Sequence, residues 1–575
     1  MESMNEGWRR GVGTLRLNEN IVFFENSNEV KASTSTIHHS DIQYWIILTN
    51  EPSQVCPRLI VLSSQITQCI FLSVAVSGDK RDQGSPFSPQ GLATPAGIDQ
   101  PDVTIDTLQD DVLLEIFDSF RKIVVRHDRM WSWRTLLHVC RRWRYIVLAS
   151  PRRLDLQIKC HRFLRTMKLL DHWPSHPIFI DCSSWYGPGD PVNHNIFAAL
   201  QQRSRISQMD FIDIAWEEMK QFASAMGGPF PVLTRLRVYV RNDLPTGVLP
   251  DSFLGGSASR LELFNLRGSA FPALTNLVLS ATHFRHLHLR DIPHAGYIPP
   301  EAMVTFPLPL HNLEGLTIGF VSPESRPLQM SPPPSTLALL PSLTDFEFDG
   351  AGEYLVDFIA RIDTPMLDNF PMTLYSDIIP NISQLHKFID RTDRLKTFTE
   401  AEVSICRWEV QAIFESGADL GLDITFNVSL TDSPLPSLLR LYEQFPTIPS
   451  QIEKLILCEE SLDKSLCEQM IFLQDGEEQW ECDENDPQWL EILIPFVSVK
   501  RLYVTEVLGP YIASALKTLR EERVAEVFPA LESLFFEIFG SSSSVEETLK
   551  SFVTRRQLSG HPVIVRRWED DSMSQ

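Results

Sequence analysis

The sequence predicts a mixed α/β protein in which a short helical module precedes a long, irregular solenoid of β-strands and helices. Three observations support this fold class. Residues 102–150 carry the apolar spacing of two amphipathic helices. From about Leu154 onward, short apolar segments alternate with turn residues. One of these segments recurs as a proline-led phrase at strand-like periodicity.

The first predicted helix, 107–122, has signals at both ends. Thr107 is its expected N-cap, with Asp110 three residues later as the capping partner. Acidic residues near the start and Arg121 and Lys122 near the end suit the helix dipole. One apolar stripe runs along it, formed by Val112, Leu113, Ile116, Phe117 and Phe120.

The second predicted helix covers about 132–149 and ends at Ser150, because the residue before a proline avoids helical backbone. Its apolar face holds Leu136, Cys140, Trp143 and Val147, with Leu137 and Ile146 beside it. Two helices in about fifty residues make too small a core to be stable alone. We therefore expect the pair to pack on the next domain or on a partner.

The proline-led phrase has the form P-x-L-x-x-L/F-x-apolar. It occurs as FPVLTRLRV (230–238), FPALTNLVL (271–279), LPSLTDFEF (340–348) and FPALESLFF (528–536). Weaker versions are HFRHLHL (283–289), HNLEGLTI (311–318), QIEKLIL (451–457) and SVKRLYV (498–504). Its last two apolar positions are two apart, so they face one side of a strand. The phrase therefore predicts eight solenoid strands.

Spacing makes the solenoid irregular. The first leucines at 233, 274, 313 and 343 are 41, 39 and 30 residues apart, whereas leucine-rich repeats run about 20–29 residues. Helices and loops would fill the longer intervals. The alternative is a set of unrelated amphipathic strands in an α/β domain.

Charge argues against a polyanion partner for the chain as a whole, since the formal net charge is −23. Residues 121–168 carry a local excess of +12, which leaves nucleic-acid binding as a separate hypothesis. The segment 459–491 holds twelve acids and one lysine. Within it, the run 474–489 lacks the spacing of an EF-hand, so we interpret it as a solvated acidic loop.

The nine cysteines form no CxxC pair, which indicates reduced thiols of a cytoplasmic or nuclear protein. Residues 1–79 form an extension of unknown structure and contain no secretory signal pattern. The uncharged stretch 59–78 has the length of a membrane span, but its polar residues favour a buried strand or helix, and we expect no membrane association. Residues 80–101 are rich in Pro, Gly, Ser and Gln and are expected to be a disordered linker.

Motifs of catalysis are not found: the chain lacks a P-loop, a dinucleotide fingerprint, a nucleophile elbow and an HExxH helix. No cofactor is expected, and the chain is predicted not to be an enzyme. A histidine cluster at His283, His286, His288 and His294 makes a metal site conceivable. Solvent-side histidines on a core strand are the simpler interpretation, because no carboxylate or thiol completes the set.

The segments IDTLQDDVLLEIF (105–117) and LLHVCRRWRYI (136–146) together resemble an F-box. SPRRLDLQIKC (150–160), TIGFVSPESRPLQ (317–329), LVDFIARIDTPMLDNF (355–370) and RQLSGHPVIVRRW (556–568) are similar to phrases of fungal F-box proteins with a degenerate leucine-rich-repeat region. The resemblance implies an F-box module at 102–150, a repeat domain at 151–568 and a tail at 569–575.

Such a protein would be a non-catalytic substrate receptor of an SCF-type ubiquitin ligase. The resemblance implies that the F-box docks on a Skp-family adaptor, and through it a cullin, while the repeats hold an unknown protein target. One departure is Gln109, which stands where the family usually has proline. The alternative is a repeat-type interaction module without ligase function. The implied docking residues are Leu108, Val112, Leu113, Ile116, Phe117, Val139, Cys140, Trp143 and Ile146.

Overall fold

A computed structural model gives the fold as two compact units, Met1–Leu156 and Gln157–Gln575. It describes the backbone of five short strands before residue 64. Apart from a few positions within them, it also describes residues 108–124, 136–150, 153–161, 170–171, 176–183, 193–241, 247–305, 311–327, 334–379, 381–406, 409–428, 434–459, 486–519, 523–537 and 543–568.

The first unit begins with two small antiparallel sheets. The strands are β1 (Thr14–Leu17), β2 (Asn20–Phe23), β3 (Thr36–His39), β4 (Ile42–Thr49) and β5 (Arg58–Ser63). The uncharged stretch 59–78 therefore begins as strand, and its remainder lies outside the described residues. Where the structure describes helices, none is long and apolar enough to cross a membrane. The linker predicted at 80–101 also lies outside the described residues.

Two helices follow, α2 (Asp110–Val124) and α4 (Arg141–Ala149). The expected cap of the first, Thr107, lies outside the described residues. The second begins later than the predicted start near Ser132. Cys140 has extended backbone (φ −154°, ψ 172°) and caps α4, its Sγ accepting the backbone N–H of Trp143 at 3.4 Å. The second helix therefore cannot run unbroken through Cys140.

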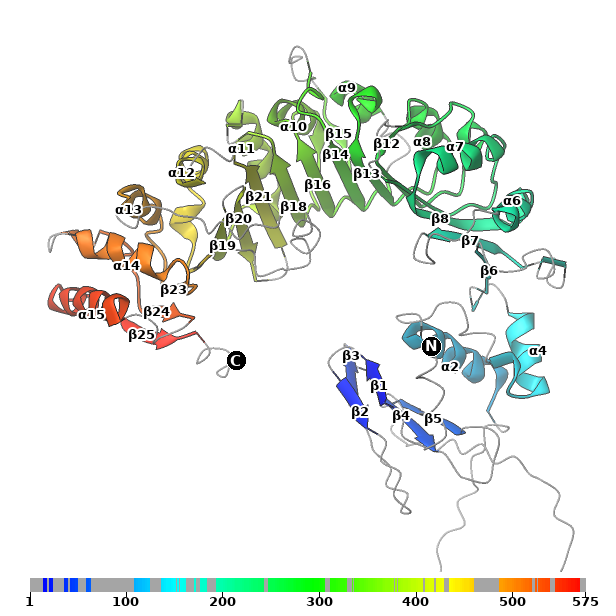
Figure 1. The fold of residues 1–575 in the computed structure, drawn as a ribbon, viewed down its shortest axis with the longest axis horizontal. Helices are drawn as coiled ribbons and strands as arrows, with labels where there is room; N and C mark the ends of the chain where they lie inside the picture. The colour runs from blue at the N-terminus through cyan, green and yellow to red at the C-terminus, as the bar shows by residue number, and fades with distance from the viewer. Residues whose placement is uncertain are drawn as a thin grey trace, which may run out of the picture. The chain divides into compact units, whose positions relative to one another are not determined.

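The second unit is built on a sheet of sixteen strands (Figure 1). Neighbouring strands are parallel except at β20, which is antiparallel to both of its neighbours. This confirms a mixed α/β fold with a large, mostly parallel sheet. In sheet order the strands are β25 (Ile564–Arg567), β24 (Ser533–Phe536), β23 (Arg501–Val504), β22 (Lys454–Cys458), β19 (Glu400–Ile405), β20 (Glu409–Ser416), β21 (Leu420–Asn427), β18 (Asn369–Leu374), β16 (Asp345–Gly350), β14 (Gly315–Phe320), β13 (His286–Ile292), β11 (Leu263–Arg267), β9 (Arg235–Val240), β8 (Ile206–Ile214), β7 (Ile178–Ser183) and β6 (Ile158–Cys160).

Ten helices of this unit lie along one face of the sheet in Figure 1. They are α6 (His194–Leu200), α7 (Trp216–Ala225), α8 (Leu274–Ser280), α9 (Pro300–Thr305), α10 (Gly352–Ile359), α11 (Ile382–Arg391), α12 (Pro434–Gln444), α13 (Gln488–Leu493), α14 (Gly509–Thr518) and α15 (Ser543–Leu558). Two-stranded pairs, β10 (Gly247–Val248) with β12 (Ser269–Ala270) and β15 (Ala338–Leu339) with β17 (Ile362–Asp363), and short 3-10 turns complete the connections.

Side chains alternate between the two faces of each strand. In β9, Leu236, Val238 and Val240 are buried in the core, whereas Arg235 and Arg237 point the other way. We call the side of the sheet that holds Arg235, Arg237 and their register partners the strand face. The helices cover the opposite face, so chemistry carried by the strand face depends on every second residue of each strand.

A triplet of buried apolar residues marks each parallel repeat, at a first position and then three and five residues later. Its first positions are 206, 233, 261, 284, 313, 343 and 367, so successive repeats lie 23 to 30 residues apart. A backbone contact recurs just before the strands as well: one carbonyl accepts the N–H groups of two consecutive residues of the next repeat, as Thr234 O does from Glu262 and Leu263. The repeat is therefore more regular than the sequence phrases predicted.

Seven of the eight predicted phrases end in strands, and the prediction for 271–279 was wrong. That phrase forms helix α8, in which Leu274, Leu277 and Val278 are buried at helical spacing while Leu279 is 51% exposed. The strand of this repeat lies earlier, at β11, and starts from the unrecognised triplet of Leu261. A second irregularity is the β20–β21 hairpin, which places two strands between β18 and β19.

Candidate functional site

The helix pair of the first unit packs through aromatic and aliphatic side chains. The rings of Phe117 and Trp143 lie 4.7 Å apart, centroid to centroid, at 58°. Leu113 and Ile146 are buried with them. This contact holds α2 against α4, and the apolar stripes predicted for the two helices account for it.

Arginines join the two helices at the rim of this contact. Arg142 donates to Asp110 Oδ1 at 2.6 Å and to the backbone carbonyl of Leu108 at 2.5 Å, so it holds the start of α2. Arg153 donates to Glu115 at 2.5 Å and to Asp111 at 3.2 Å. These arginines have partners within the unit, which weakens the nucleic-acid interpretation of the basic segment.

The nine implied docking residues divide into two groups. Leu113, Phe117, Trp143 and Ile146 are buried in the contact between the helices. Val112 and Val139 are 40% and 46% exposed, and Cys140 is exposed as the cap of α4. Leu108 and Ile116 are half-buried. Tyr145, which the sequence analysis did not select, is 72% exposed on α4.

The strand face of the second unit carries ordered rows of polar side chains, because parallel strands in register bring equivalent positions together. The middle row changes sign along its length. Read from β9 to β19 by register, it consists of Arg237, Asn265, His288, Thr317, Glu347, Pro371, Asp423, Ile413 and Glu402. Donors stand at one end of this row and carboxylates at the other.

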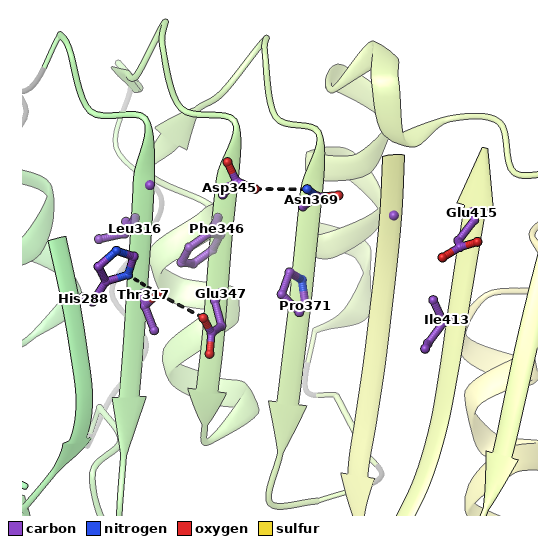
Figure 2. A pocket seen from close by; sticks show the side chains of 12 residues that line it. His288, Leu316, Thr317, Asp345, Phe346, Glu347, Asn369, Pro371, Ile413 and Glu415 are labelled. Carbon is purple, nitrogen blue, oxygen red and sulfur yellow. Dashed lines mark hydrogen bonds between the residues drawn. The ribbon is translucent and has the colours of Figure 1, made fainter. Parts of the chain in front are cut away.

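A hollow of about 440 Å³ lies where the two ends of that row meet (Figure 2). Gly315 is part of its lining, and a side chain there would not fit, because an added Cβ would lie 2.8 Å from His286 Nδ1. The lining residues are His288, Gly315, Leu316, Thr317, Asp345, Phe346, Glu347, Asn369, Pro371, Ile413, Glu415 and Gly421. Strands β13, β14, β16, β18, β21 and β20 all contribute to it.

A hydrogen-bonded chain crosses the hollow. Thr317 Oγ1 donates to Glu347 Oε2 at 3.1 Å, so its contact with His288 Nδ1 at 2.8 Å requires the imidazole to donate. Arg290 donates to the same Glu347 oxygen at 2.5 Å. Burial, with Arg290 and His286 nearby, lowers the pKa of His288 to about 4. The imidazole is therefore neutral at pH 7 and fixes the hydroxyl toward the carboxylate.

The predicted histidine cluster is only partly assembled. His286 and His288 share the strand face, with rings stacked 6.0 Å apart. His294 instead contacts Ser325 at 3.3 Å, and His283 lies in the turn before β13. Within the described ranges, no three His, Cys, Asp or Glu side chains are grouped to hold a metal ion.

Carboxylates on the other side of the hollow are held in a strongly negative environment. Burial, then the charges of Asp291 and Glu347, raise the pKa of Asp349 to about 7. Burial raises the pKa of Asp423 to about 6, against hydrogen bonds that favour its charged form, and burial also raises the pKa of Glu409. This side of the strand face therefore favours positive charge.

No protein-family model matches this chain, and no curated protein sequence matches it. The site must therefore be interpreted from its own geometry. Sequence reasoning selected the helix pair and missed the acidic strand residues. The signal was present in DFEFD (345–349) and EAE (400–402), where acids occupy alternate positions of a strand.

Proposed function

We propose that the protein is the substrate-recognition adaptor of an SCF-type ubiquitin ligase. Residues 102–150 would act as an F-box that binds a Skp-family adaptor, and the strand-and-helix repeats as a leucine-rich-repeat-like domain that holds a protein target. It would act without catalysis, by bringing the target close to a ubiquitin-transferring enzyme. The observation that carries the proposal is the packed α2–α4 pair, whose sequence resembles an F-box and which leaves Val112 and Val139 exposed.

Co-purification with a Skp-family adaptor tests this function. We expect the full chain to retain the adaptor and the double variant Val112→Glu plus Val139→Glu to lose it, because charged side chains in an apolar interface leave buried, unpaired charge. The matched control is Leu279→Glu, which places the same charge on an equally exposed apolar position of α8. Retention of the adaptor by the double variant would contradict the docking surface.

The second candidate is an interaction module without ligase function. Gln109 favours it, because the proline that usually stands at this position pre-organises the start of the helix. The variant Gln109→Pro separates the two candidates. If the wild-type chain fails to bind the adaptor and the proline variant gains binding, the module has lost its ligase role through this residue.

A further inference from the structure

Five adjacent strands, β16, β18, β21, β20 and β19, carry eight carboxylates and no lysine, arginine or histidine. All eight lie on the strand face by register, and we call this set the acidic half. The flanking strands supply Arg290 to Glu347 and Lys454 to Glu400. The eight residues are Asp345, Glu347, Asp349, Glu400, Glu402, Glu409, Glu415 and Asp423.

The hollow is a second, independent feature of this surface. It lies at the edge of the acidic half, and Asp345 and Glu415 stand on either side of it in Figure 2. Between them in the same row come Asn369 and Gly421, an amide and a position without a side chain. A segment entering the hollow would therefore reach the sheet between two carboxylates.

We propose that the acidic half of the strand face binds an extended segment of a protein target that is rich in lysine and arginine. Charge complementarity identifies this occupant, because an acidic or neutral segment would leave the carboxylates without added partners. The five strands span about 20 Å, since neighbouring strands lie ~4.8 Å apart. An extended segment of about six or seven residues crosses that distance. The inference deepens the proposed function, on which it rests for the consequence of binding.

Fluorescence anisotropy with the purified full chain tests the inference without any ligase component. The probes are three labelled peptides of identical length in which every second residue is lysine, glutamine or glutamate. We expect the lysine peptide alone to bind, with affinity that falls as salt rises, because exposed charge pairs are screened. Binding of the glutamate or glutamine peptide as tightly as the lysine peptide would overturn the inference, as would no binding of the lysine peptide.

The double variant Asp345→Asn plus Glu415→Gln removes two charges at the hollow and keeps the hydrogen-bonding capacity of both side chains. We expect it to bind the lysine peptide about fivefold to tenfold more weakly, since each exposed charge pair contributes modestly. The control Asp251→Asn plus Glu217→Gln removes two exposed charges elsewhere, and we expect no change. Equal weakening by both double variants would indicate a net-charge effect and overturn the assigned surface.

Failure of the inference and failure of the proposed function give different results. If the lysine peptide binds but no Skp-family adaptor co-purifies, the surface stands and the ligase role fails. If the adaptor co-purifies but the peptide series shows no preference for lysine, the ligase role stands and the target chemistry is wrong. Unchanged melting temperatures of the variants ensure that lost binding reports the surface and not unfolding.

Discussion

At the scale of single residues, burial decides which groups carry charge. Asp349 and His288 lie on the same face of the sheet, and burial opposes the charged form of each. The histidine, next to Arg290, stays neutral across the physiological range. The aspartate, next to Asp291 and Glu347, titrates inside that range. One surface therefore holds an inert hydrogen-bond donor and a pH-sensitive acid a few strands apart.

The first prediction concerns Asp349. Its folded-state pKa of about 7 lies above its ordinary value of 3.8, so the folded protein holds this proton more tightly than the unfolded chain. The stability it contributes is fully present below pH 3.8 and is lost as pH rises to about 7. We expect Asp349→Asn to raise the melting temperature more at pH 8 than at pH 5. An equal shift at both values would show that burial of Asp349 does not perturb its titration.

The second prediction separates packing from docking in the helix pair. Trp143→Ala removes a buried ring that stacks on Phe117, and such truncations cost about 3–5 kcal/mol. Tyr145→Ala removes a ring that is 72% exposed, so we expect a change within about 0.5 kcal/mol. Limited proteolysis of the full chain measures both: cleavage between residues 108 and 150 should accelerate only for the first variant. Equal cleavage of both would contradict the packing of α2 against α4.

At the scale of elements, the sequence predicted strands well wherever apolar residues alternate strictly. The segment 271–279 failed because Leu274, Leu277 and Val278 fit helical spacing, while Leu277 and Leu279 fit strand spacing. Local pattern cannot choose between these; packing against the sheet does. The β20–β21 hairpin was not predicted either, since its residues lack the proline-led phrase. The hollow requires six strands to come into register, which no local pattern specifies.

The third prediction tests the helical assignment of α8. Val278 is fully buried and Leu279 is 51% exposed, whereas the strand interpretation would bury Leu279. We expect Val278→Ala to lower the free energy of unfolding by about 2 kcal/mol and Leu279→Ala to change it by less than about 0.5 kcal/mol. Chemical denaturation followed by circular dichroism gives both values. The reverse order of the two variants would restore the strand interpretation of 271–279.

At the scale of the second unit, stability is distributed along the sheet. Each strand pairs only with its neighbours, so a repeat contacts the repeats beside it and none farther along. Stability then approximates a sum of local terms and nearest-neighbour interfaces. A surface built across several repeats, such as the acidic half, depends on repeats that need not unfold together. Damage at one end of the sheet should leave the other end folded.

The fourth prediction follows from this arrangement. Leu534 is fully buried in β24, and Leu534→Ala should cost about 2–5 kcal/mol through the cavity it leaves. Because β24 pairs with β23 and β25 only, hydrogen exchange should accelerate across 501–567 while β9 to β13 keep the protection of the wild-type chain. The matched variant Leu236→Ala in β9 should give the opposite pattern, with accelerated exchange at β8 to β11. If either variant accelerates exchange uniformly along the sheet, the sixteen strands unfold as one cooperative unit. The acidic half would then be lost together with the rest of the sheet.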